Sequence, residues 1–289
     1  MRRVIMPGRA ARPAAAWPAA AWTVAACLAA GTAVTGCLPY ARAESGLLAK
    51  ETLVAGVRPD LPGIGGRRRD GTFEGLDVDV AAYVAKALGK RVRIVPAAAA
   101  DRERLLLKDR SVDMILTYWV RADWKARIAF AGPYVPSYQD ILVRSGERRI
   151  QNVHDLAGRP ICAVKGAGAS DLVIKGLRVP AVPVRTDGYA QCTAMLRDGR
   201  IDAITTNDTI LAGLRNQQGT AFRLLGARFG EQRTGIGMRP GDPDGCEAVN
   251  KAITRMYQDG SMARSLRRWF GGSGLDLSVV AVPQFEGCD

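Results

Sequence analysis

One short pattern occurs twice in this chain, and it constrains the fold more than any other feature of the sequence. Leu107-Lys-Asp-Arg-Ser-Val-Asp-Met-Ile-Leu-Thr117 resembles Leu196-Arg-Asp-Gly-Arg-Ile-Asp-Ala-Ile-Thr-Thr206. Each copy is typical of a helix end, a tight turn and a buried strand. We therefore expect two α/β units of similar construction, in which Thr117 and Thr206 end equivalent strands. The alternative is chance, or the turn chemistry that all helix-turn-strand segments share.

The segments around both copies alternate between strand-like and helix-like patterns. The expected strands are 53–57, 91–95, 112–117, 161–164, 181–185, 201–206 and 235–239. The expected helices are 77–88, 101–108, 189–197, 243–259 and 262–270, and a glycine-rich turn at 166–170 leads into a further helix. Asp77 is a candidate N-cap for the first helix. Such alternation predicts parallel sheets that are covered by helices.

The order of these elements predicts two lobes. Too little chain follows the second unit to form a third domain, so the last strand and helices should return to the first unit. We expect lobe 1 at 50–142 and 237–289, and lobe 2 at 143–236. The fold class is thus α/β, with two lobes joined by a hinge of two crossovers around a closing cleft. Ligands of open α/β sheets bind beyond the carboxyl ends of the strands, where both threonines are expected.

The N-terminal segment is typical of an export signal. Four arginines precede an uncharged, alanine-rich stretch that ends at Val34-Thr35-Gly36-Cys37. Small residues before a single cysteine resemble a lipobox, so we expect 1–36 to be cleaved, Cys37 to carry a lipid and 37–49 to form a tether. An ordinary signal peptide and a transmembrane helix are the alternatives. Cleavage lowers the formal net charge from +13 to +9, which leaves a basic protein at the anionic outer surface of the cell membrane.

Four cysteines remain in the mature chain once the two of the N-terminal segment are set aside. An even number in an exported protein predicts disulfides, and we expect the pairs Cys162–Cys192 and Cys246–Cys288. Four free buried thiols are the alternative. The lack of a Cys-x-x-Cys pair argues against zinc, and a single histidine, His154, excludes a histidine-rich metal site. We therefore expect neither a metal nor another cofactor.

Seven short stretches carry a likeness to a known protein family. They are Gly56-Val-Arg-Pro-Asp-Leu-Pro-Gly63, Asp70-Gly-Thr-Phe-Glu-Gly-Leu-Asp-Val-Asp-Val80, Val112-Asp-Met-Ile115, Phe130-Ala-Gly-Pro-Tyr134, Asp155-Leu-Ala-Gly158, Gly199-Arg-Ile-Asp-Ala203 and Gly260-Ser261. In this order and spacing, the mature chain resembles the family 3 solute-binding proteins of ABC transporters, and among them the glutamate-type lipoproteins of high-GC Gram-positive bacteria. The resemblance implies a type II periplasmic-binding fold, a small solute such as an amino acid in the cleft, and docking of a monomer to a membrane permease.

The first lobe departs from the pattern of this family. The family holds the ligand carboxylate with an arginine before the Phe-x-x-Pro-Tyr motif, because a guanidinium forms a bidentate fork. An ungapped count back from Phe130 places Trp124 there and Arg121 at the family's threonine, whereas a later gap places Lys125 there. Lysine is a point charge, so neither alignment restores the fork. The candidate binding residues from this segment are Thr117, Tyr118, Arg121, Trp124 and Lys125.

The second lobe departs from the pattern as well. Its glycine-rich loop offers one hydroxyl, so Gly168 and Ser170 are the candidates there, with backbone N–H groups that suit an anion. The family's partner for the ligand ammonium is an aspartate after the 199–203 motif, and by count Asn207 occupies this position. Asn207 is neutral and cannot form the ion pair, but the adjacent Asp208 could replace it after a small shift of the loop.

These departures leave several functions open. The protein binds an amino acid with rearranged charges, or it binds another small solute, or it has lost tight binding and acts as a sensor or accessory lipoprotein. A dehydratase on the same fold would need a cleft carboxylate, for which Asp123 and Asp208 are the candidates, but no paired motif supports an enzyme. Scattered basic residues and export argue against nucleic acid. For a carboxylate ligand, Lys125→Ala should weaken binding more than Arg67→Ala.

Overall fold

The computed structural model describes residues 46–275, 277 and 281–288, so the signal segment, Cys37 and most of the tether lie outside the described residues. The strands are β1 (Thr52–Val57), β2 (Gly66–Arg67), β3 (Phe73–Glu74), β4 (Arg91–Pro96), β5 (Met114–Trp119), β6 (Ala129–Arg144), β7 (Pro160–Val164), β8 (Val182–Thr186), β9 (Ile204–Asn207), β10 (Phe222–Leu224) and β11 (Phe229–Met238). The α-helices are α1 (Leu76–Ala87), α2 (Ala122–Lys125), α3 (Ala169–Asp171), α4 (Tyr189–Arg197), α5 (Asp208–Gln218), α6 (Pro243–Gln258) and α7 (Ser261–Phe270). Over these residues, no helix is both long enough and apolar enough to cross a membrane.

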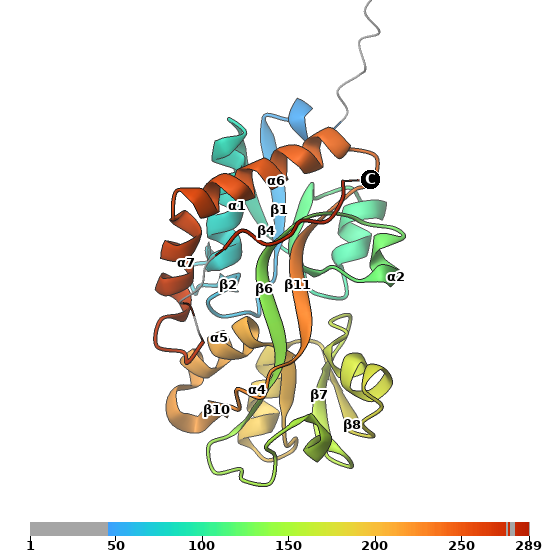
Figure 1. Ribbon diagram of the computed structural model, residues 1–289, viewed down its shortest axis with the longest axis vertical. Coiled ribbons are helices and arrows are strands. Elements are labelled where there is room, and N and C mark those ends of the chain that lie inside the picture. Colours follow the sequence, from blue (N-terminus) through green and yellow to red (C-terminus); the bar gives the residue numbers. More distant parts are fainter. Residues whose placement is uncertain (1–45, 276, 278–280, 289) are drawn as a thin grey trace, which may run out of the picture. The chain divides into compact units, whose positions relative to one another are not determined.

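A mixed sheet of seven strands runs through the described part of the chain (Figure 1). Its order is β10-β6-β11-β5-β1-β4, and β9 pairs with β6. β1 lies parallel to β4 and β5, whereas β11 lies antiparallel to β5 and β6. β6 and β11 extend from the group of β1, β4 and β5 to the group of β7, β8 and β10, so these long strands are the two crossovers between the lobes. The structure thus has the two-lobed α/β fold that the sequence predicts.

The lobe boundaries stay a prediction, because they fall on continuous strands. The expected boundary at 142/143 lies within β6, and the one at 236/237 lies within β11. The sequence shows no strand at β6, since Pro133 and Pro136 cannot donate to a ladder and indicate a break. β11 begins at Phe229 rather than at residue 235, and the helix α5 is likewise absent from the prediction.

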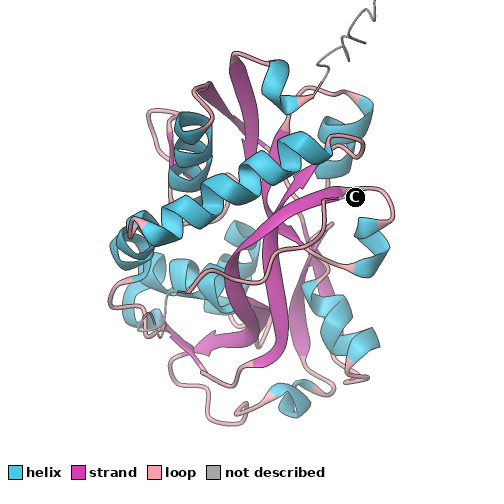
Figure 2. Cartoon of the chain, turned by 45° about the horizontal axis from the view of Figure 1, so that its top comes forward, coloured by secondary structure: helices cyan, strands magenta, loops and turns pink. Residues whose placement is uncertain are grey.

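Helix α1 packs against the sheet of lobe 1. Its buried positions share one apolar cluster with α6 and α7, and Figure 2 shows the long helix α6 lying across the strands. The helix begins after Gly75, whose φ of 127° favours glycine, and a Cβ at this position would overlap the backbone of Ile64. The prediction of Asp77 as the N-cap is therefore wrong. Gly75 is the N-cap residue, and Asp77 points from the first turn into the interior.

Two disulfides join the cysteines in the predicted pairs. Cys162 on β7 bonds to Cys192 on α4, and Cys246 on α6 bonds to Cys288 in the C-terminal segment. The Cα atoms of each pair are 5.7 Å apart. The second bond holds the C-terminal segment against lobe 1, where the Glu286 N–H also donates to a carbonyl oxygen of β6 at 2.7 Å.

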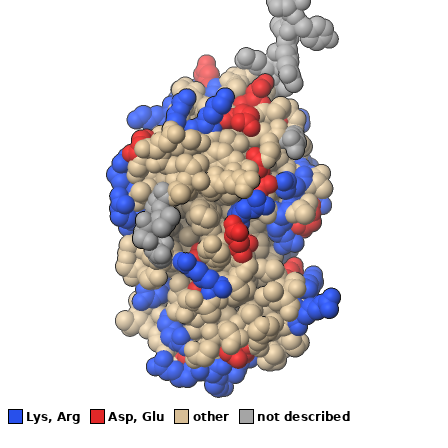
Figure 3. Space-filling model, viewed as in Figure 1, with Lys and Arg blue, Asp and Glu red and all other residues tan. Residues whose placement is uncertain are grey.

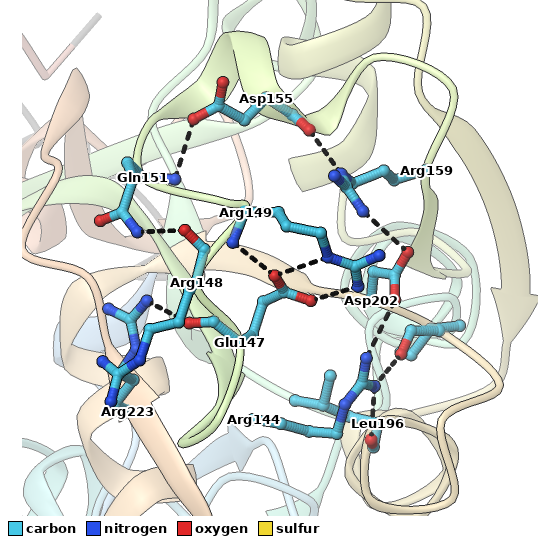
Figure 4. Close-up of polar contacts among 11 residues, drawn as sticks. Arg144, Glu147, Arg148, Arg149, Gln151, Asp155, Arg159, Leu196, Asp202 and Arg223 are labelled. Atoms are coloured by element: carbon cyan, nitrogen blue, oxygen red, sulfur yellow. Dashed lines mark hydrogen bonds and ion pairs between the residues drawn. The ribbon is translucent and has the colours of Figure 1, made fainter.

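Basic side chains are spread over the surface. On the face shown in Figure 3, they are scattered over the centre and the edges rather than forming one continuous patch. An arginine-rich cluster holds the loop between β6 and β7 (Figure 4). In it, Arg149 donates to both carboxylate oxygens of Glu147, at 3.1 and 2.6 Å, and Arg144 donates to Asp202 at 2.9 Å. These arginines pair with neighbouring carboxylates and stabilise the loop, which gives them a structural role.

Candidate functional site

A small cavity lies between the lobes, at the carboxyl ends of β5 and β9. Its volume is about 10 Å³, and we call it the inner cavity. Its lining residues are Arg58, Arg102, Thr117, Trp119, Ala167, Tyr189, Thr206 and Ile210. Thr117 and Thr206 are the two residues that the repeated sequence pattern places at equivalent strand ends. The structure therefore brings the two copies of the pattern together at one place.

Arg102 reaches the inner cavity from the segment after β4 and is only 3% exposed. Its guanidinium donates to the carbonyl oxygens of Ala99 at 3.2 Å, Thr117 at 2.9 Å and Gly166 at 2.9 Å. The last of these bonds joins lobe 1 to lobe 2. Burial, together with the nearby charge of Arg58, lowers the pKa of Arg102 to about 10, so the group keeps its proton at neutral pH.

Arg58 supplies a second guanidinium, which is also 3% exposed. Its Nε and Nη2 donate to the carboxylate of Asp60 at 2.8 and 2.7 Å, and Asp60 accepts a further bond from the Tyr189 N–H of lobe 2 at 3.1 Å. Burial favours the neutral form of Asp60, but the hydrogen bonds and charge of Arg58 outweigh it and hold the pKa below its usual value. Asp60 thus pairs with Arg58, and Arg102 has only carbonyl partners among the described residues, so positive charge is in excess at the inner cavity.

A buried network holds Thr117 beneath these cations. The Thr117 hydroxyl and the Tyr134 hydroxyl each donate to Asp77 at 2.6 Å, and the Thr117 N–H donates to the Tyr134 oxygen at 2.9 Å. Thr117 has a φ of 49°, which is unusual for a β-branched residue. The network therefore fixes the direction of the Thr117 carbonyl, which accepts from Arg102. Burial raises the pKa of Asp77 to about 7, and its two hydroxyl donors oppose that rise.

A larger space of about 870 Å³, the outer cleft, adjoins the inner cavity across the 166–168 loop. Four predicted candidates line it, namely Arg121, Trp124, Gly168 and Ser170. The Trp124 ring lies between two guanidinium groups, with its centroid 5.3 Å from that of Arg102 and 4.9 Å from that of Arg121. Trp124 therefore lines the outer cleft next to Arg102, and its place at the family's arginine position stays a prediction.

Two candidates from the first lobe lie outside both spaces. Tyr118 alternates with Thr117 along β5, so its ring points to the other face and packs edge-on against Trp124, with centroids 4.9 Å apart. Lys125 donates to Glu286 of the C-terminal segment at 2.7 Å. The expectation that Lys125 takes the place of the arginine fork stays a prediction, and in this structure its ammonium is paired with Glu286.

The two candidates after β9 also point away from the inner cavity. β9 continues to Asn207, whose side chain turns into the sheet, accepts from the Trp119 indole at 2.6 Å and donates to two hydroxyls of β6 and β11. Asp208 begins α5 in a separate cavity of about 250 Å³, where its carboxylate lies 3.2 Å from the Nε of Arg228. Burial raises the pKa of Asp208 to about 6, against the nearby charge of Arg228. Neither residue lines the inner cavity in this structure, and their role in binding stays a prediction.

The charged residues of the inner cavity are absent from the sequence prediction. Arg58 directly follows β1, and Arg102 lies in the first turn of the helical segment that follows β4; an arginine at either place is ordinarily expected to be exposed. The sequence could still have pointed to these two arginines, because each follows the carboxyl end of an expected strand. The segments after parallel strands form the binding edge of such a sheet.

Four glycines, which we call the glycine seam, allow close approach of the lobes: Gly166, Gly168, Gly188 and Gly213. A Cβ at Gly166 would lie 2.8 Å from the Ala99 carbonyl oxygen, and one at Gly168 would lie 2.6 Å from Arg121 Nη1. A Cβ at Gly213 would overlap the Pro62 carbonyl oxygen. Gly166 and Gly213 therefore meet backbone atoms of the other lobe, and Gly168 and Gly188 meet the side chains of Arg121 and Asp60.

Two α/β lobes, two crossing strands and a positively charged cavity between the lobes define a cleft-type binding protein with the type II periplasmic fold. Residues 53–272 match the bacterial extracellular solute-binding proteins, family 3. The chain belongs to this family.

Relatives of established name agree with this assignment. The chain is 34% identical to the glutamate-binding protein GluB of Corynebacterium glutamicum over 259 residues, which cover 84% of this chain and 87% of the relative. It is 31% identical to the L-cystine-binding protein TcyJ of Escherichia coli over 238 residues, 79% of this chain and 88% of the relative. An ancestral arginine-binding protein bound to arginine superposes with a TM-score of 0.70 at 25% identity, over 77% of this chain and 99% of that structure. These relatives are binding proteins, and the chain is accordingly a solute-binding protein and not an enzyme.

Proposed function

We propose that this protein is a lipid-anchored receptor that captures a carboxylate solute, an acidic amino acid such as glutamate or a relative, and delivers it as a monomer to an ABC transporter permease. The observation that carries the ligand class is the pair of buried guanidinium groups of Arg58 and Arg102, which have a single ion-pair partner. The named function of the glutamate-binding relative supports the same class.

The two guanidinium groups have donors to spare for a carboxylate. Arg58 uses Nε and Nη2 for Asp60, and its Nη1 donates to no protein atom within the described residues. Arg102 has carbonyl partners alone in that part of the chain, so its charge is not neutralised there. A solute carboxylate that enters while the lobes are apart would supply the missing negative charge. The bonds from Arg102 to Gly166 and from Tyr189 to Asp60 join the lobes here around a space of about 10 Å³, which holds no more than about one water molecule, so both bonds have to open to admit the carboxylate.

Calorimetry on the mature, delipidated protein tests this site. Arg102→Gln should weaken glutamate binding by about 10- to 100-fold, because each hydrogen bond to a charged group is worth about 1.5–3 kcal/mol. Lys125→Ala and Asp208→Asn are the controls and should stay within about twofold of the unaltered protein, since neither side chain lines the inner cavity. A larger loss for Lys125→Ala than for Arg102→Gln would return the carboxylate to its sequence-predicted position and overturn the proposal.

A sensor or accessory role is the second candidate, and the replacement of the family's fork by Trp124 favours it. A thermal-shift screen of amino acids, amines, organic acids and sugars separates the two functions. A ligand at a hundredfold excess over its Kd stabilises the folded state by about 2.7 kcal/mol. If no compound moves the melting curve, transport of a captured solute is replaced by the sensor role.

The lipid anchor is a separate part of the proposal and rests on the lipobox-like sequence before Cys37. Cells that express the full chain should incorporate radiolabelled fatty acid into it, and Cys37→Ser should abolish the label and release the protein from membranes. Membrane retention of an unlabelled Cys37→Ser protein would instead identify the N-terminal segment as a transmembrane anchor.

A further inference from the structure

The outer cleft contains a pair of basic side chains that the proposed site does not use. Lys165 directly follows β7, and Arg185 lies on β8. In the parallel pairing of these strands, Arg185 is opposite Ala163, and the Lys165 N–H donates to the carbonyl of Thr186 at 2.9 Å. Side chains two residues apart on a strand share a face, so Lys165, Ala163 and Arg185 project from the same face of the sheet. That face forms the floor of the outer cleft.

These two cations are the basic groups of the outer cleft without a counter-ion. The other basic side chains of its lining are paired, Arg121 with Asp123 at 2.9 Å and Lys175 with Asp171 at 3.1 Å. Within the described residues, Lys165 and Arg185 form no ion pair, and Asp187 is the one lining carboxylate that also forms none. The unpaired groups therefore amount to two positive charges against one negative charge.

The size of the outer cleft indicates what these cations can bind. The inner cavity measures about 10 Å³ and the outer cleft about 870 Å³, and the Trp124 ring and the 166–168 loop separate them. A solute whose carboxylate occupies the inner cavity can extend a longer body toward the outer cleft, whose lining residues Gly166 and Gly168 flank Ala167 of the inner cavity; a further space of about 640 Å³ lies beside Trp119 but lacks Lys165 and Arg185. Gly166 lies against Ala99 and Gly168 lies against Arg121, so the two spaces join only when the lobes part and the solute enters.

We propose that Lys165 and Arg185 bind a second acidic group at the far end of the solute, so that the preferred ligand is an elongated dianion longer than free glutamate. The class is that of an acidic dipeptide or a similar dicarboxylate. The inference rests on the proposed function, because Arg58 and Arg102 have to hold the first carboxylate. It extends that function by giving the cleft a second recognition point, at which solutes of equal charge but different length are distinguished.

Calorimetry with three probes tests the inference: glutamate, γ-glutamyl-glutamate and γ-glutamyl-alanine amide, in which the amide removes the carboxylate at the far end. The unaltered protein should bind γ-glutamyl-glutamate at least about tenfold more tightly than either other probe. The double variant Lys165→Gln/Arg185→Gln should lose this preference and keep its affinity for glutamate within about twofold. Lys108→Gln/Arg200→Gln is the matched control, because it removes the same charge from exposed positions that line neither space, and it should keep the preference.

The outcomes separate the inference from the proposed function. If glutamate binds but γ-glutamyl-glutamate does not bind more tightly, or if the double variant keeps the preference, the second recognition point is refuted and the carboxylate receptor stands. If the control variant also loses the preference for γ-glutamyl-glutamate, the preference depends on the net charge of the protein and the inference is again refuted. If none of the three probes binds the unaltered protein, the proposed function itself is wrong.

Discussion

Replacing Asp77 with asparagine tests whether burial governs the network under the inner cavity. Asp77 is fully buried, and its side chain accepts hydrogen bonds from Thr117 and Tyr134. Asparagine has the same size and resembles the protonated acid, so Asp77→Asn keeps the packing and removes the titration. The stability of the variant should therefore depend on pH differently from that of the unaltered protein.

The sign and size of the difference follow from the pKa of Asp77. The carboxyl titrates at about 7 in the folded protein, against a usual value of 3.8. Between these values the unfolded chain gives up the proton while the folded protein keeps it, so the free energy of unfolding falls as the pH rises. One pKa unit corresponds to about 1.4 kcal/mol, so the fall between pH 5 and pH 8 is about 3 kcal/mol. The free energy of unfolding of Asp77→Asn should not fall in this way, because asparagine does not titrate.

Urea unfolding at several pH values between 5 and 8 measures the effect. The free energy of unfolding of the unaltered protein, minus that of Asp77→Asn, should decrease by about 3 kcal/mol across this range, because the other titrating groups cancel in the difference. The exposed Asp198→Asn serves as the control and should run parallel to the unaltered protein. If Asp77→Asn also runs parallel, Asp77 titrates like an exposed acid and the reasoning from burial is refuted.

Three further changes test the packing around the cleft. Serine at both Cys162 and Cys192 should lower the free energy of unfolding by about 3.6 kcal/mol in calorimetric melts, because the bond closes a loop with a sequence separation of 30; an unchanged melting temperature would contradict this. Gly213→Ala should cost about 1–3 kcal/mol by the same method, since its Cβ overlaps the Pro62 carbonyl, and an equal melting temperature would show that this segment yields freely. Trp119→Phe should cost about 1–3 kcal/mol in urea unfolding because it leaves a buried amide oxygen without its donor, and a loss below about 0.5 kcal/mol would argue against that bond.

The strand ends of the fold could be predicted from the sequence, but the charges at the site could not. A repeated helix-turn-strand pattern is local, so it places Thr117 and Thr206 at equivalent ends without any knowledge of tertiary contacts. The burial of Arg58 and Arg102 depends on partners in the other lobe, among them the Gly166 carbonyl. Long-range contacts of this kind leave no mark on the sequence near either arginine.

The side-chain directions at the end of β9 were beyond sequence reasoning for another reason. Successive residues of a strand face opposite sides, so the direction of a side chain depends on where the strand stops. β9 continues to Asn207 and α5 begins directly after it, which turns Asn207 into the sheet and Asp208 toward Arg228. A count along the family pattern gives the position of a residue but not the face from which it projects.

The glycine seam has a consequence for engineering. Because Gly166 and Gly213 meet the other lobe at the backbone of Ala99 and Pro62, this part of the contact makes no demand on the side chains that recognise the solute. Recognition and closure are thus partly separable properties of this chain. Substitutions at Trp124, unlike those at Arg102, remove no hydrogen bond between the lobes, so they should change which solute is selected while the lobes still close, and a fluorescent reporter attached away from the seam would give the same read-out for each new specificity. The protein is on this ground a scaffold for a series of sensors that differ only in their ligand.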